Sequence, residues 1–186
     1  LYACGVDNCL IDVDAPEFPI LDGSAISYVS KIKEVGLMMQ DADRKYILFK
    51  RKKIRVTDKK TGSYLVLLPD DKFSIECQIS FDSTLLKHQE ARLDDLSDFT
   101  KEIASARTFV FVREIQTLLS HNLIKGGDFD NAIVIYDKRI DQEDYDHLAD
   151  DMGVVHKDSS KLGYVMNKPL HYINEPARHK LLDVIG

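Results

Sequence analysis

The chain has 186 residues, enough for one domain or two small ones, and its 44% hydrophobic and 30% charged residues are typical of a soluble globular protein. Its net charge of -6 argues against a nucleic-acid-binding protein. No apolar run approaches the roughly 20 residues of a membrane-spanning helix, and no charged segment followed by an apolar core indicates a signal peptide.

Cysteine usage indicates the redox compartment. The three cysteines are odd in number and lack metal-ligand spacing. We therefore predict reduced thiols in a cytoplasmic protein. The apolar runs and the net charge described above predict no transmembrane segment and no nucleic-acid partner.

The first 40 residues predict three elements. Residues 1–5 are typical of the end of a helix, so we expect the sequence to be a fragment that starts inside one. Residues 9–14 alternate apolar and polar, which predicts a half-buried strand. A helix then follows, with Asp22 or Ser24 as its N-cap and Gly36 at its end.

Strands follow. Residues 46–49, 54–56 and 64–68 have strand composition, and residues 58–62 form the turn before the last of them. The basic cluster at 50–55 suggests phosphate binding, but a solvated sheet face or edge is the simpler interpretation.

The cleanest strand pattern is strict alternation at 73–81, just after a predicted domain junction at 69–71. Cys77 falls on its apolar face, so we interpret it as a small core residue rather than a nucleophile. His88 lies in a polar segment and is expected at the surface.

The next segment predicts a short helix at 96–105, capped by Ser97 or Asp98. A β-rich run at 108–112, helical spacing at 113–120 and an apolar strand at 132–135 then form a strand–helix–strand unit of about 30 residues. A tight turn is expected at 125–128, between the last two.

Residues 137–168 have no evident role. The acidic stretch 142–152 has helical character, and 161–168 fits a strand or a flap. His147, His156 and His171 stand at no ligand spacing and are interpreted as structural or surface residues.

The last stretch predicts a helix in which Pro176 occupies the first turn. His179 and Asp183 are four residues apart, so both side chains lie on one helix face. Imidazole nitrogen and carboxylate oxygen both bind divalent metals, zinc above all. From spacing alone, an ordinary ion pair on a solvated face is the simpler interpretation.

The surrounding residues favour the metal. Residues 175–186 closely resemble the zinc-site helix of the UDP-3-O-acyl-N-acetylglucosamine deacetylase family, which catalyses the committed step of lipid A synthesis. Two further stretches resemble the same family and occur in the same order as in the family. The first comprises residues 5–8 and 14–24, and the second comprises residues 106–111, followed by Gly126-Gly127 and residues 131–134.

The resemblance implies zinc-dependent amide hydrolysis, with Zn²⁺ held by His179 and Asp183. In the family, a Glu-His motif just upstream of Leu1 supplies the third ligand and the general base, and a histidine and an acid follow Gly186. We therefore expect the given residues to lack part of the catalytic set and to be inactive in isolation.

The resemblance also assigns substrate contacts. It gives Thr108 the role of donor to the oxyanion of the tetrahedral intermediate; otherwise Thr108 is an ordinary strand residue. It places Phe109, Phe111, Ile115 and Ile124 in an apolar passage for the acyl chain of UDP-3-O-acyl-N-acetylglucosamine, although these side chains equally suit the core of the insert, and it assigns Gly127 to substrate binding. Lys180 suits the nucleotide phosphates or a solvated helix face.

The fold implied is α+β. It has two domains of similar topology, each a mixed sheet with helices on one face, and the helix layers lie between the sheets. Residues 1–69 would form the C-terminal part of the first domain and 70–186 the second, with a βαβ insert at 108–136. Two alternatives stay open: a non-catalytic domain that binds an acylated nucleotide sugar, and a zinc amidohydrolase with another substrate.

Overall fold

The computed structural model describes residues 1–46, 52–124 and 126–186, which form a mixed arrangement of helices and small sheets. Its helices are α1 Ile26–Val35, α2 Phe99–Glu102, α3 Val112–Ser120, α4 Gln142–Met152 and α5 Glu175–Ile185. Its strands are β1 Ile54–Thr57, β2 Tyr64–Leu67, β3 Ile75–Ser80, β4 His88–Leu93, β5 Phe109–Phe111, β6 Ile133–Tyr136 and β7 Gly163–Val165, with 3₁₀ turns at Tyr2–Cys4 and Leu96–Asp98.

Three small sheets organise the described residues. β1 pairs with β2 and β3 pairs with β4, both antiparallel. β5 and β6 are parallel and α3 connects them, so the predicted strand–helix–strand unit is confirmed. β7 then pairs antiparallel with β6 and completes a three-stranded sheet.

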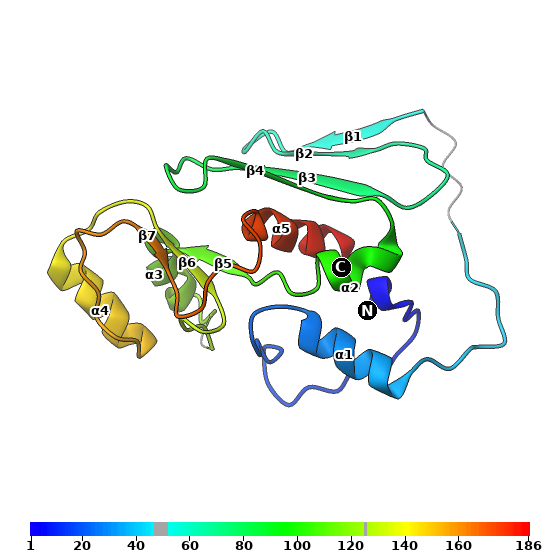
Figure 1. The fold of residues 1–186 in the computed structure, drawn as a ribbon, viewed down its shortest axis with the longest axis horizontal. Coiled ribbons are helices and arrows are strands. Elements are labelled where there is room, and N and C mark those ends of the chain that lie inside the picture. The colour runs from blue at the N-terminus through cyan, green and yellow to red at the C-terminus, as the bar shows by residue number, and fades with distance from the viewer. Residues whose placement is uncertain (47–51, 125) are drawn as a thin grey trace.

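Helix α5 packs on the β3–β4 ribbon and lies next to α2 (Figure 1). Ala177 and Leu181, four residues apart on the buried face of α5, are both fully buried. They join a core to which β3, β4, α2, β5 and β6 also contribute. The helix that carries the candidate metal ligands is therefore fixed by its apolar face.

The three-stranded sheet lies between two apolar clusters. Phe111, Ile133 and Ile135 face the core that contains α5. Val134 and Tyr136, at the intervening positions of β6, face a second cluster with α3 and α4. In Figure 1 α4 accordingly lies at the far end of this sheet from α5.

The strand predicted at 9–14 is wrong. Residues 9–14 are exposed, Leu10 to 95%, and within the described ranges they pair with no strand. Apolar–polar alternation produces a strand only where a neighbour supplies hydrogen bonds and a surface to cover. Most of the strand predicted at 46–49 lies outside the described residues.

Strand β4 was missed, although it is the partner of β3. Its six residues are mostly polar, and only Ala91 and Leu93 are buried. The strand predicted at 73–81 is confirmed as β3, and Cys77 is half-buried there. Burial raises the pKa of the Cys77 thiol, which agrees with a core role.

The caps differ in detail from those predicted. At α1 the Asp22 carboxylate accepts hydrogen bonds from Ser24, whose hydroxyl accepts from the N–H of Ile26 at 3.3 Å, although Ala25 is the N-cap residue. Gly36, at φ 80°, ends α1 as predicted. Helix α2 is shorter than the predicted 96–105. Asp98 is its N-cap residue, as one of the two predicted alternatives, but makes no side-chain cap hydrogen bond, and Asp95 caps the 3₁₀ turn before it.

Among the described helices, none combines the length and the apolar character needed to cross a lipid bilayer.

Gly23 is expected to contribute strongly to the stability of the fold. It adopts φ 80°, and a Cβ atom there would lie 1.7 Å from the Asn131 carbonyl oxygen. Gly23→Ala should therefore cost on the order of 3 kcal/mol or more of unfolding free energy, from steric overlap added to backbone strain. Chemical denaturation measures the loss.

Gly62→Ala is the matched control. Gly62 has φ 77°, but nothing lies within 4 Å of the added Cβ atom. Only the cost of the backbone conformation, about 1 kcal/mol, should remain. If both variants lost the same unfolding free energy, the close approach to Asn131 would contribute nothing to the effect of Gly23→Ala.

Candidate active site

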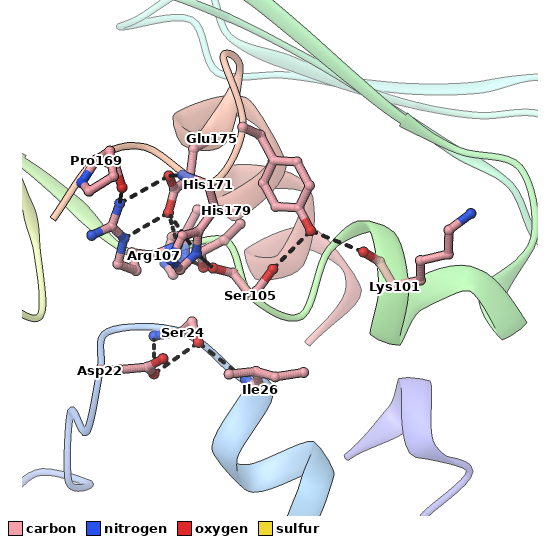
Figure 2. A network of polar contacts seen from close by, with 12 residues as sticks. Asp22, Ser24, Ile26, Lys101, Ser105, Arg107, Pro169, His171, Glu175 and His179 are labelled. Carbon is pink, nitrogen blue, oxygen red and sulfur yellow. Dashed lines mark hydrogen bonds and ion pairs between the residues drawn. The ribbon is translucent and has the colours of Figure 1, made fainter.

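A buried ion pair holds the start of α5. The Glu175 side chain is fully buried, and its carboxylate accepts hydrogen bonds from the Arg107 backbone N–H and Nε, each at 2.9 Å, and from Nη2 at 3.2 Å (Figure 2). The His171 backbone N–H donates to the same carboxylate at 2.6 Å. Arg107 Nη2 also donates to the Pro169 carbonyl at 2.7 Å. Arg107 therefore joins three chain segments.

Glu175 is charged despite its burial. Burial by itself raises the pKa of its carboxyl, but hydrogen bonds from Arg107 and His171 outweigh burial and hold the pKa below its usual value. The charge also suits the first turn of a helix, where the helix dipole favours an anion.

His179 lies one turn further along α5. Its Nδ1 lies 2.9 Å from the Ala106 carbonyl oxygen (Figure 2). Because a carbonyl can only accept, Nδ1 carries the hydrogen, and in the neutral ring the lone pair is on Nε2. Nε2 lies 3.6 Å from Asp183 Oδ1. A histidine whose second ring nitrogen donates to a carbonyl has the arrangement usual for metal ligands.

This pair fits zinc in chemistry and spacing. Two ligands about 2.0–2.1 Å from a tetrahedral zinc ion are roughly 3.3 Å apart, close to the observed 3.6 Å. Lys180 Nζ lies 2.7 Å from the other carboxylate oxygen of Asp183 and leaves Oδ1 facing His179. Across residues 1–46, 52–124 and 126–186, no group of three potential ligands forms.

Thr108 follows the carbonyl that orients His179 by two residues. Its backbone is fixed on both sides, since its N–H donates to Gly23 at 2.7 Å and its carbonyl accepts from Ile133 at 2.8 Å. Thr108 lines an apolar cavity, so the segment that orients His179 leads directly to that cavity.

The cavity has a volume of about 140 Å³. Phe109, Ile115 and Ile124, three of the four residues that the resemblance assigns to the acyl passage, line it together with Gly127 and Thr108. An apolar cavity of about 150 Å³ in a protein core holds a benzene-sized guest. This cavity can therefore accommodate a short length of hydrocarbon.

Phe111 does not line the cavity, so the structure does not support its predicted contact with the acyl chain. It is 1% exposed and packs on Phe81 at a ring-centroid distance of 5.1 Å, in the core that contains α5. Val110, on the opposite face of β5, lines the cavity, and Phe109, which shares a face with Phe111, both lines the cavity and packs against the core that contains α5.

Sequence reasoning missed part of the cavity wall. Val110 and Val134 form its sheet side, and α4 provides Tyr145, Leu148, Ala149 and Met152. Because alternate residues of a strand face opposite sides of the sheet, the sequence could have placed these two valines on one face. Helix α4 was predicted but was given no role.

The remaining candidates lie near the site or apart from it. Lys180 Nζ is 5.8 Å from the ring centroid of Phe109, so Lys180 lies between the metal pair and the cavity. His88 and His147 are exposed, and His156 pairs at the surface with Asp150, which raises the pKa of His156. Besides its backbone bond to Glu175, His171 places Nδ1 2.8 Å from the Ser105 carbonyl oxygen.

Comparison with known proteins shows which family the chain resembles. The model of the UDP-3-O-acyl N-acetylglycosamine deacetylase (LpxC) family matches residues 1–159. The chain is 61% identical to the bifunctional enzyme LpxC/FabZ of Porphyromonas gingivalis and 56% identical to that of Bacteroides thetaiotaomicron, over its full length and 40% of each relative. It is 37% identical to the UDP-3-O-acyl-N-acetylglucosamine deacetylase of Syntrophus aciditrophicus, over 100% of the chain and 51% of that protein. The chain thus spans about half or less of these relatives, whose alignments also include α5.

The buried pair should dominate local stability. Glu175→Gln leaves the Arg107 charge buried without its counter-ion, so we expect a loss of about 3–5 kcal/mol in unfolding free energy. The control is Glu34→Gln, which breaks an exposed pair with Lys31 and should cost about 0.5 kcal/mol or less. Chemical denaturation of both variants makes the comparison, and similar small losses would contradict the anchoring role.

The same pair predicts acid sensitivity. Because the folded pKa of Glu175 lies below its ordinary value of 4.5, its stabilisation is present above that value. It is lost as the pH falls from about 4.5 through the lowered folded pKa. Thermal melts from neutral to acidic pH should show a steeper decline in the parent than in Glu175→Gln, and parallel declines would contradict the assignment.

Proposed function

Because the chain belongs to the UDP-3-O-acyl N-acetylglycosamine deacetylase family, we propose that the protein containing it removes the N-acetyl group of UDP-3-O-acyl-N-acetylglucosamine. This reaction is the committed step of lipid A synthesis, and the same proposal includes a cytoplasmic location. The given residues contribute part of the site, since the chain spans 40% of the two bifunctional LpxC/FabZ relatives.

One observation carries the proposal. The Ala106 carbonyl orients His179, and two residues later Thr108 and Phe109 line the apolar cavity. A candidate metal ligand, a hydroxyl donor and an apolar site are thereby joined along one short segment. An acylated sugar with a scissile amide needs these three features together.

His179 Nε2 and an oxygen of Asp183 are the proposed zinc ligands, and the third comes from residues outside this sequence. Zinc held there supplies Lewis-acid polarisation of the amide carbonyl and acidifies the attacking water. The Ala106 carbonyl holds the His179 ring in place for this role. The general base is likewise assigned to residues outside this sequence.

Thr108 and Lys180 act on the substrate. The Thr108 hydroxyl donates to the oxyanion that forms when water adds to the amide carbon. The Lys180 ammonium attracts the diphosphate of the nucleotide. Phe109, Ile115, Ile124 and Gly127 contact the acyl chain, and burial of that chain gains about 0.8 kcal/mol for each methylene.

The domain division belongs to the same proposal. Residues 1–69 form part of a first domain and 70–186 a second of similar topology, with 108–136 as its insert. The zinc site then lies between the helix layers of the two domains.

Acetate release by the full-length protein tests the function. We expect zinc-dependent release from UDP-3-O-acyl-N-acetylglucosamine. Tight binding of this substrate without release would support a binding-only protein, and release only from other acetylated amides would support a different amidohydrolase. Either outcome would overturn the proposal.

His179→Ala should abolish zinc binding by the full-length protein, because it removes one of a small number of ligands. Zinc content after dialysis, measured by atomic emission, checks this. His156→Ala is the matched control, since His156 also pairs with an aspartate but lies apart at the surface, and it should retain zinc. Undiminished zinc in His179→Ala would refute the ligand assignment.

Thr108→Ala should lower kcat on the order of 10²–10³-fold with little change in KM, because the oxyanion exists only after water has added. Thr108→Ser keeps the hydroxyl and should retain most of the activity. Steady-state kinetics separate the two constants. If Ala and Ser variants were equally active, the hydroxyl would have no catalytic role.

A further inference from the structure

Helix α4 has an acidic outer surface and an apolar stripe that faces the cavity. Tyr145, Leu148, Ala149 and Met152 line the cavity at helical spacing. Tyr145 also stacks on Tyr136 of β6, with ring centroids 4.5 Å apart and planes inclined by 12°. The helix is therefore held firmly against the sheet.

The cavity extends from the α5 side of the molecule toward α4. Thr108 and Phe109 line it, and the Phe109 ring lies 5.8 Å from Lys180 Nζ on α5. The α4 side chains line it too, and α4 lies beyond the three-stranded sheet from α5 (Figure 1). A chain whose head group lies at α5 would thus point its tail at α4.

The lining selects hydrocarbon. Nearly all of it is aliphatic or aromatic, and a volume of about 140 Å³ suits a segment of roughly six carbons, by comparison with cavities that bind benzene. The polar lining side chains, Thr108, Asp128 and Lys157, can contact a head group or solvent but have no partner in an alkyl chain.

We propose that α4 is the end wall of this cavity and that Ala149 and Met152 set the longest saturated chain that it accepts. The inference rests on the proposed function in that the chain is the acyl group of the substrate. It adds residues from 142–152, a segment for which the sequence indicated no role.

Ala149→Leu tests the end wall. Leucine adds three carbons at a position that is 9% exposed and lines the cavity, so it should exclude about three methylenes of the ligand. Each excluded methylene weakens binding roughly fourfold, which gives a loss on the order of 50-fold for a chain that fills the cavity. A chain too short to reach α4 should bind as before.

Met152→Ala makes the opposite change. It shortens a half-buried lining side chain, so the longest chains should bind more tightly than they do to the parent, while short chains are unaffected. His147→Leu is the control for α4 itself, because His147 is exposed and does not line the cavity. Its chain-length profile should match that of the parent.

The probes are UDP-N-acetylglucosamine derivatives with butanoyl, hexanoyl and decanoyl groups at the 3-oxygen, which are respectively shorter than, equal to and longer than the segment that the cavity suits. Calorimetry with the zinc-depleted full-length protein gives their dissociation constants without turnover, and kinetics of the zinc-loaded protein give KM and kcat. Thermal melts establish that each variant is folded. If either Ala149→Leu or Met152→Ala is unfolded, the remaining one of these two variants provides the test.

A shift of the preferred length, shorter for Ala149→Leu or longer for Met152→Ala, supports the inference. A folded variant with the profile of the parent, or with equal loss at every length, overturns it, as does a parent that binds all three derivatives equally. Length-dependent binding without acetate release would refute the proposed function alone and leave the end wall intact.

Discussion

The arrangement of the site depends on the buried pair between Arg107 and Glu175. Two backbone N–H groups, of Arg107 and His171, donate to the same carboxylate as the guanidinium, so the pair also fixes the path of the chain at two points. Glu175 is the first residue of α5. Fixing it beside Arg107 brings the Ala106 carbonyl within hydrogen-bonding distance of His179, one turn along the helix. The orientation of the candidate zinc ligand thus follows from an ion pair that does not touch the metal.

The small β5–β6–β7 sheet separates two roles. One face belongs to the core that holds α5, where Phe111, Ile133 and Ile135 are buried. The other face, with Val110 and Val134, borders the cavity under α3 and α4. Strand alternation places Val110 and Val134 on the cavity side and Phe111, Ile133 and Ile135 on the core side, whereas Phe109, at the start of β5, contacts both. It also explains why neighbouring residues of the motif at 106–111 have different surroundings.

Where local pattern and burial agreed, the sequence predicted the structure well. Strict alternation identified β3, and the spacing from Pro176 to Gly186 identified α5, because each has one face on the core. It failed where tertiary context decided: β4 has few apolar residues but pairs along all of β3, and residues 9–14 alternate but have no described partner. The Arg107–Glu175 pair joins residues 68 positions apart, and no local pattern predicts it. The resemblance identified the family, whereas the cavity wall from α4 required the structure.

We propose above that α5 holds zinc through His179 and Asp183. The most direct measurement is anomalous X-ray diffraction at the zinc edge from crystals of the zinc-loaded full-length protein. The account predicts a peak about 2.0–2.2 Å from both His179 Nε2 and an Asp183 oxygen. A peak that is absent from this pair, or that lies instead at His156 and Asp150, would contradict it.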